Sequence, residues 1–345
     1  MSLARAIETG DLAQLPSRRD EDWRWTDLRG LLRTLPGAPV DAAVAGEGPF
    51  AALGGDVYLA PNGRVEGFTP IRAGAGRSEL AQLRFVATAP GSTAASLAVE
   101  IEPGASLTLL ESYEGQADGA VVSVQLDIVL GEGARLDRVV LADDGPASVT
   151  VSTARIFLAA GARVGQTVLT SGARRQRLET HVAHPGSDAA IRLDGAYLLA
   201  GQRHADLTTV VTHGGLHGTT SQLTKGVVTD QARGVFQGRI VVEHGADHTD
   251  ARMGHHALIL SDRAEVDARP ELLIFADDVQ CAHGNTVGVL DEDALFYARQ
   301  RGIPLDAARA LLTEAFVGEV IDRIDHEGAR EVARAWAAAR LGRAE

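Results

Sequence analysis

The chain has few of the residues that many metal and carbohydrate sites require. Its 345 residues include one cysteine, Cys281, and only 4% of them are aromatic. A single thiol excludes an internal disulfide and a closed all-cysteine metal site, because a structural zinc site or a simple iron-sulfur cluster takes about four protein ligands. The scarcity of aromatic side chains also argues against an enzyme that acts on polysaccharides.

Long apolar runs and an excess of basic residues are missing as well. No stretch of roughly 18 apolar residues, the length that spans a bilayer, is present, and residues 1–10 lack the apolar core of a signal peptide. With 46 acidic against 33 basic residues the formal charge is -13, which opposes binding to nucleic acid or to an anionic membrane. We therefore expect a cytoplasmic protein whose partners are other proteins.

A short phrase recurs along the middle of the chain. It reads Gly104-Ala105-Ser106-Leu107, Gly133-Ala134-Arg135-Leu136, Gly161-Ala162-Arg163-Val164 and Asp188-Ala189-Ala190-Ile191, and a further match begins at Gly245. The first four copies are 29, 28 and 27 residues apart, and Gly245 lies three periods of 28 after Gly161. Such a period predicts units of two or three short strands stacked as a solenoid, so we favour a β-helix. Chance recurrence in an alanine-rich chain is the alternative.

Changes in residue pattern divide the chain into four predicted regions. They are a helical segment at 1–33, irregular strands leading into the core at 34–94, the β-helix core at 95–290 and a helical domain at 291–345. In the first region we expect Trp23 and Trp25 to be packing anchors. In the last, acidic residues at 291–293, Gly302 and Pro304 delimit helices. We expect these helices to cap the open edge of the β-helix and to offer a docking surface.

The segment around the single cysteine is the strongest candidate site. Cys281 and His283 are two residues apart, and on an extended backbone such residues point to the same face. A thiolate and an imidazole supply half of a tetrahedral metal site, so the other ligands would have to come from another chain. The alternative is that Cys281 is a small buried apolar residue and His283 a surface residue. Asn285 either caps a turn, since Asn tolerates a left-handed backbone, or hydrogen-bonds a sulfur.

The other histidines do not form a recognisable metal motif. Three pairs stand out, namely His213 with His217, His244 with His248, and His255 with His256. A spacing of four suits two ligands on a helix, but these stretches are glycine-rich and strand-like, and no His-Glu-x-x-His is present. We predict strand-surface or turn positions for all of them. Phosphate-binding loops, nucleophile elbows and dinucleotide fingerprints are also absent, so we expect no independent catalysis.

An ordered series of segments runs from Lys225 to Phe316. They are Val235-Phe236-Gln237-Gly238-Arg239-Ile240, residues 260–267, Arg269-Pro270-Glu271-Leu272, Ala276-Asp277-Asp278-Val279, Cys281-Ala282-His283-Gly284 and residues 290–297. This series resembles the SufB/SufD family of iron-sulfur cluster assembly scaffolds. Residues 16–26 also look like the opening of SufD, whereas residues 35–220 match only in texture. The chain is most similar to SufD because it is short, lacks an N-terminal cysteine cluster and keeps His283 before a glycine.

The resemblance implies an architecture and a set of partners. It implies a right-handed parallel β-helix between N-terminal and C-terminal helical regions, in a complex with SufB and two copies of the ATPase SufC. In that complex SufC docks on the helices at about 291–325, and SufB pairs along the β-helix near Cys281 and His283. ATP hydrolysis then belongs to SufC, and this chain is a non-catalytic assembly subunit.

The same resemblance implies a transient iron-sulfur cluster and no tightly bound cofactor. His283, with or without Cys281, would contribute to a nascent cluster whose thiolates come largely from SufB. We favour His283, because a neutral imidazole is a good ligand for iron whereas the thiol must first be deprotonated. A metal-free structural scaffold, homodimeric or heterodimeric, is the alternative, and the chain alone could form a homodimer.

Overall fold

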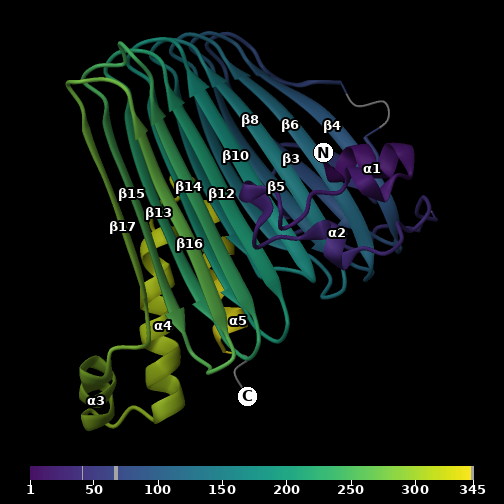
Figure 1. Ribbon diagram of the computed structural model, residues 1–345, viewed down its shortest axis with the longest axis vertical. Coiled ribbons are helices and arrows are strands. Elements are labelled where there is room, and N and C mark those ends of the chain that lie inside the picture. The colour runs from purple at the N-terminus through teal and green to yellow at the C-terminus, as the bar shows by residue number, and fades with distance from the viewer. Residues whose placement is uncertain (41, 66–68, 343–345) are drawn as a thin grey trace.

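Two β-sheets, each built of parallel strands, face each other in the structure (Figure 1). The computed structural model describes residues 1–40, 42–65 and 69–342. Small parts of two predicted regions, residues 41 and 66–68 of the second and residues 343–345 of the last, lie outside the described residues.

One sheet of the described chain has nine strands and the other has eight. The nine-stranded sheet contains β1 (Asp56–Pro61), β3 (Ser78–Ala87), β5 (Ser106–Gly115), β7 (Arg135–Asp143), β9 (Arg163–Thr170), β11 (Ala190–Leu199), β13 (Thr219–Val228), β15 (Asp250–Ile259) and β17 (Gln280–Gly288). The eight-stranded sheet contains β2 (Ile71–Ala73), β4 (Gly91–Ile101), β6 (Ala120–Leu130), β8 (Val149–Leu158), β10 (Arg175–His184), β12 (His204–His213), β14 (Arg233–Val242) and β16 (Glu265–Ile274). Consecutive strands alternate between the sheets and neighbouring strands pair in parallel. Each turn therefore adds one strand to each sheet, which confirms the predicted β-helix.

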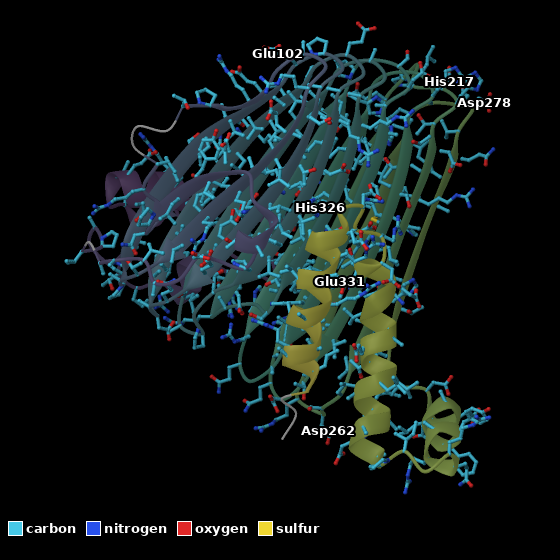
Figure 2. All side chains as sticks on the ribbon, turned by 180° about the vertical axis from the view of Figure 1, so that it is seen from behind. Glu102, His217, Asp262, Asp278, His326 and Glu331 are labelled. Carbon is cyan, nitrogen blue, oxygen red and sulfur yellow. The ribbon has the colours of Figure 1, made fainter. Side chains whose placement is uncertain are left out.

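The recurring phrase corresponds to the turn that enters each strand of the nine-stranded sheet. Two residues before the strand the backbone is left-handed, with φ of 67°, 64°, 66°, 62°, 56° and 61° at Gly104, Gly133, Gly161, Asp188, His217 and His248. Figure 2 shows Glu102, His217 and Asp278 along this edge of the solenoid and Asp262 at the opposite edge. The fifth copy of the phrase was predicted to begin at Gly245, which is three residues too early. The left-handed residue that enters β15 is His248, and an additional turn at residues 244–245 precedes it.

Alternate side chains of both sheets point inward and build one apolar core. Leu109, Leu136 and Ile156 belong to it, and it already includes Leu83 and Phe85 of β3. β3 and β4 run for ten and eleven residues. The strands before residue 95 are therefore more regular than predicted, because β3 already contributes buried residues to the core and pairs with β5.

The N-terminal segment lies on the outer face of the eight-stranded sheet. It contains α1 (Leu3–Thr9), η1 (Leu12–Gln14), η2 (Glu21–Trp23) and α2 (Leu28–Leu31), where η denotes a 3₁₀-helix, and η3 (Ala51–Leu53) follows. Leu3 packs in one cluster with Val121 and Val149, and the Trp23 ring lies 4.5 Å from the guanidinium carbon of Arg177. Trp23 is thus a packing anchor, although the predicted helical segment is broken into short turns.

Three helices follow the solenoid, α3 (Glu292–Gln300), α4 (Leu305–Ile321) and α5 (Glu327–Leu341). α4 and α5 cover the outer face of the nine-stranded sheet, where Val317, Val320 and Trp336 share a cluster with Val139 and Leu198 (Figure 2). The prediction that these helices cap the open edge is wrong, because apolar residues on the flat side of the sheet hold them there. α3 contacts α4 and stands clear of both sheets (Figure 1). Among the described helices, none has the length and apolar character needed to cross a membrane.

Candidate functional site

The solenoid ends in an uncovered turn. β16 and β17 are the last strands of their sheets, and within the described residues each pairs with one neighbour only, β14 and β15 respectively. An edge strand presents unpaired backbone N–H and C=O groups on its free side. Large apolar side chains are exposed on this turn, namely Leu273, Ile274 and Val287. We call the surface formed by residues 265–288 the open end.

Cys281 and His283 lie at the open end and face the space between the sheets. In the register of β17 with β15, Cys281 is paired with Ala251 and His283 with Met253. Ala251 and Met253 are buried in the interior core, so the side chains directly beyond them in β17 also point inward. Cys281 is half-buried and packs against that core, whereas His283 is exposed. The two side chains therefore share one face, as their spacing predicts.

The thiol and the imidazole differ in how readily they could bind a metal ion. Burial raises the pKa of the Cys281 thiol, and a backbone hydrogen bond from Ala251 offsets this only in part. The thiol is therefore protonated at neutral pH unless a cation displaces the proton. No described residue hydrogen-bonds the His283 ring, which leaves its nitrogens accessible. Of the two side chains, His283 is the more exposed.

The donor set at the open end is incomplete for a metal ion. In residues 1–40, 42–65 and 69–342, no group of three or more His, Cys, Asp or Glu side chains could hold one. A tetrahedral site takes four ligands, so a metal ion held by Cys281 and His283 would need further ligands from another molecule. A hollow of about 400 Å³ lies elsewhere, around Arg163 on the outer flank of the nine-stranded sheet.

Asn285 is the next inward-facing residue of β17 after His283. The turn interpretation is wrong, because Asn285 lies within the strand beside His255 of β15. Its Oδ1 is 2.6 Å from Nδ1 of His255, whose Nε2 is 2.9 Å from the hydroxyl of Tyr197. Sequence reasoning missed this link. The 30 residues that separate His255 from Asn285 match the repeat period, and that spacing could have indicated neighbours in adjacent turns.

The other histidines of the three pairs lie in turns, in the interior or, for His256, on the outward-facing side of β15. His217 and His248 occupy turns, as predicted, and their rings stack at 4.8 Å. His213 and His255 are buried inside the solenoid, which contradicts the predicted surface positions. Nδ1 of His213 lies 2.5 Å from Nε2 of His184, and burial lowers the pKa of His213 to about 3. The interior accepts these rings because a neighbouring turn supplies a hydrogen-bond partner.

Similarity to known proteins is concentrated in the β-helix and the first helices after it. Residues 85–316 match the family model for the SufBD core domain of the SUF system of FeS cluster assembly. A SufBD family iron-sulfur cluster assembly protein of Synechocystis is 31% identical over 237 residues, covering 66% of this chain and 52% of that protein. The iron-sulfur cluster assembly protein SufD of Escherichia coli is 30% identical over 234 residues, covering 68% and 55%. The chain thus spans about half the length of these two relatives.

A third relative matches over most of its length. A SufBD family iron-sulfur cluster assembly protein of Mycobacterium bovis is 25% identical over 357 aligned positions, covering 93% of this chain and 88% of that protein. The family model includes the open end with Cys281 and His283. The chain therefore belongs to the SufB/SufD family, in which it is a SufD-like member.

Proposed function

We propose that this chain is a scaffold subunit for iron-sulfur cluster assembly that shares a nascent cluster site with a SufB-like subunit. The observation that carries the proposal is the placement of Cys281 and His283 on one face of the uncovered last turn. An accessible imidazole beside a protonated thiol is an incomplete ligand set. A cluster held in part by each of two subunits can be released when they move apart, which suits a cargo that must leave.

The open end suits a partner that is itself a β-helix. The free edges of β16 and β17 offer backbone groups for strand pairing. Exposed Leu273, Ile274 and Val287 would lose water on docking. A SufB-like subunit seated there would bring its thiolates next to His283. The chain alone could pair with a second copy through the same edges.

The C-terminal helices suit a second partner, a SufC-like ATPase. Lys225 of β13, the only lysine of the sequence, fixes α4 to the sheet through Glu319 at 2.7 Å and through the Phe316 ring at 4.2 Å. Phe296 and Tyr297 of α3 remain 63% and 60% exposed. Apolar rings on a helix that stands clear of the sheets form a natural docking surface. In this proposal the ATP chemistry belongs to the partner, and this chain transmits the motion.

A metal-free structural scaffold is the second candidate. It is favoured by the raised pKa of the Cys281 thiol and by the absence of a third ligand among the described residues. Such a scaffold would use the open end and the helices for docking only. It would be indifferent to the loss of His283.

Anaerobic purification of the coexpressed complex separates the two candidates. The chain is tagged, its cognate SufB-like and SufC-like partners are coexpressed, and iron and sulfide are measured in the recovered complex. We expect a stoichiometric complex whose iron and sulfide fall in the His283→Ala variant and fall less in Cys281→Ser. Equal iron in wild type and His283→Ala would support the metal-free scaffold. Recovery of the chain without either partner would contradict the shared site and the heterodimeric scaffold, and would leave only a homodimeric scaffold.

A further inference from the structure

A network of three hydrogen-bonded side chains, which we call the hydrogen-bond network, runs through the solenoid to the open end. Tyr197 is on β11, His255 on β15 and Asn285 on β17, so it spans the last turns of the nine-stranded sheet. Tyr197 and His255 are fully buried, whereas Asn285 is exposed. The hydrogen-bond network therefore connects the buried interior to the surface that carries His283.

The chemistry of the acceptor atoms fixes the direction of these hydrogen bonds. The Oδ1 atom of Asn285 can only accept, so Nδ1–H of His255 donates to it across 2.6 Å. Burial lowers the pKa of His255 to about 4, so the ring is neutral and its Nε2 carries no proton. That nitrogen accepts a hydrogen bond from the Tyr197 hydroxyl across 2.9 Å. With its oxygen engaged in this way, Asn285 keeps both amide N–H groups free.

The surrounding residues hold the side chains of the hydrogen-bond network in place. The Tyr197 ring crosses β13 to reach His255, and it does so above Gly226, where any Cβ would overlap the ring. Gly234 of the eight-stranded sheet also contacts this ring, and a Cβ there would overlap it as well. Phe236 stacks on His255 with centroids 4.7 Å apart and an interplanar angle of 2°. The imidazole has little freedom to turn, so the direction of the Asn285 amide is set from inside the fold.

We propose that Asn285 donates an amide N–H to a sulfur anion, sulfide or thiolate, held next to His283 at the open end. This inference rests on the proposed function and names the anion-recognising group of the same site. Asn285 and His283 are alternate residues of one strand, so their Cα atoms are about 7 Å apart and both can reach one bound sulfur. Hydrogen bonds to sulfur stabilise thiolates and sulfides and tune iron-sulfur clusters.

Two kinds of variant separate the donor role from simple packing. Asn285→Asp keeps an acceptor for His255 but lacks the N–H groups, and Asn285→Leu lacks them without adding charge. We expect either variant to retain about tenfold less sulfide in the anaerobic complex, in the range found for groups that support a metal ligand. Sulfide retention equal to wild type in both variants would overturn the inference.

Tyr197→Phe tests the hydrogen-bond network at the end that is farthest from Asn285. Without the hydroxyl donor, Nε2 of His255 can take the proton, Nδ1 becomes an acceptor, and the Asn285 amide reverses so that its oxygen faces the sulfur. ¹⁵N NMR of labelled histidine in the chain alone reports this exchange of tautomers without any cluster. Tyr113→Phe is the matched control, because its hydroxyl is also buried but bonds Glu111 and Ser152. We expect the His255 signal to change in Tyr197→Phe only, together with loss of sulfide in the complex.

The outcomes distinguish this inference from the proposed function. An unchanged ¹⁵N signal of His255 Nε2 in Tyr197→Phe would overturn the hydrogen-bond network, whatever the complex binds. Loss of iron in His283→Ala with normal sulfide in the Asn285 variants would overturn the donor role alone. Normal iron in His283→Ala would contradict the proposed function itself, while the NMR result would still stand or fall separately.

Discussion

One row of inward-facing residues has partners in the middle of the solenoid and lacks them at its end. Arg138 and Gln166 are neighbours in this row, which continues through Met253 to His283. In the middle, the Arg138 guanidinium bonds Glu111 at 2.6 Å and Gln166 at 2.6 Å, and all three side chains are buried. At the end, the described part of the chain places no further turn above His283. The difference shows that a repeat fold leaves inward-facing residues accessible where it stops.

The reason lies in the cost of burying polar groups. Inside the solenoid an unpaired polar group costs roughly 2 to 7 kcal/mol. The buried guanidinium of Arg138 avoids this cost because Glu111 and Gln166, in the two adjacent turns, accept its hydrogen bonds. At the last turn the same inward position is accessible, and its partner can come from another molecule. Polar residues of the row thus stabilise the fold in the middle, and in the proposed function they would serve recognition at the end.

Breaking the buried pair should have the largest effect. Arg138→Met leaves the Glu111 carboxylate buried without its guanidinium, and we expect a loss of about 3–5 kcal/mol in the free energy of unfolding. His283→Ala should change it by less than about 0.5 kcal/mol, because the ring is exposed. Denaturant titration measures both. As a control, Glu111→Leu with Arg138→Met should recover most of the loss, and comparable losses for Arg138→Met and His283→Ala would contradict the contrast.

Two glycines of the nine-stranded sheet offer a matched comparison. Gly226→Ala forces a methyl group into the Tyr197 ring, whereas a Cβ at Gly284 meets nothing within 4 Å. We expect Gly226→Ala to cost about 1–3 kcal/mol through overpacking and Gly284→Ala to be close to neutral. Thermal melts of the two variants check this. A larger loss for Gly284→Ala would show that the open end is as tightly packed as the interior.

Acid should destabilise the interior through its histidines. Burial lowers the pKa of His184, and it lowers those of His204, His213 and His255 to about 4, 3 and 4. Below about pH 6.5 the unfolded chain binds protons that the folded chain does not. The stability that these rings contribute is therefore complete above about pH 6.5 and is lost as the pH falls towards 3.

Two buried carboxyls act in the opposite sense. Burial raises the pKa of Asp144 to about 6 and that of Asp194 to about 7, so their contribution is present at low pH and is lost as the pH rises through these values. Since four histidines oppose two carboxyls, we expect net destabilisation between pH 6 and about pH 4. His213→Gln should reduce the slope by up to about 1.4 kcal/mol per pH unit. Parallel curves of unfolding free energy against pH for wild type and His213→Gln would contradict this account.

The smallest effect on stability is expected on the exposed helix α3. Phe296→Ala combined with Tyr297→Ala should change the free energy of unfolding by less than about 0.5 kcal/mol, because both rings face solvent. The same variant should lower recovery of the SufC-like ATPase with the tagged chain. Val320→Ala, in the covered face of α4, is the control and should lower stability by about 1 kcal/mol while keeping the ATPase. Unchanged recovery in the double variant would place the docking surface elsewhere.

Sequence reasoning captured the features that depend on short-range spacing. The repeat predicted the β-helix, and Asp188 was placed correctly in a glycine position, because the left-handed turn tolerates Asp. The two-residue spacing of Cys281 and His283 predicted their common face. The first two C-terminal helices were also predicted from their end signals.

Features that depend on which turns lie next to each other could not be predicted in the same way. His213 and His255 looked like surface residues until the partners His184 and Asn285 were known. The helices were assigned to the open edge because the pattern of α4 shows an apolar face without showing what it packs on. The sequence pattern specifies which side of a strand is apolar. Only the register between turns specifies which side chains contact each other in the interior.

The most direct test of the central claim is whether His283 binds iron at the open end. The tagged chain, labelled with ¹⁵N-histidine, is purified anaerobically with its SufB-like and SufC-like partners and reduced to an EPR-active state, and pulsed EPR measures hyperfine coupling to nitrogen. The account predicts an imidazole ¹⁵N coupling in the wild-type complex that is absent in the His283→Gln complex. The same coupling in both complexes, or none in the wild type, would contradict it.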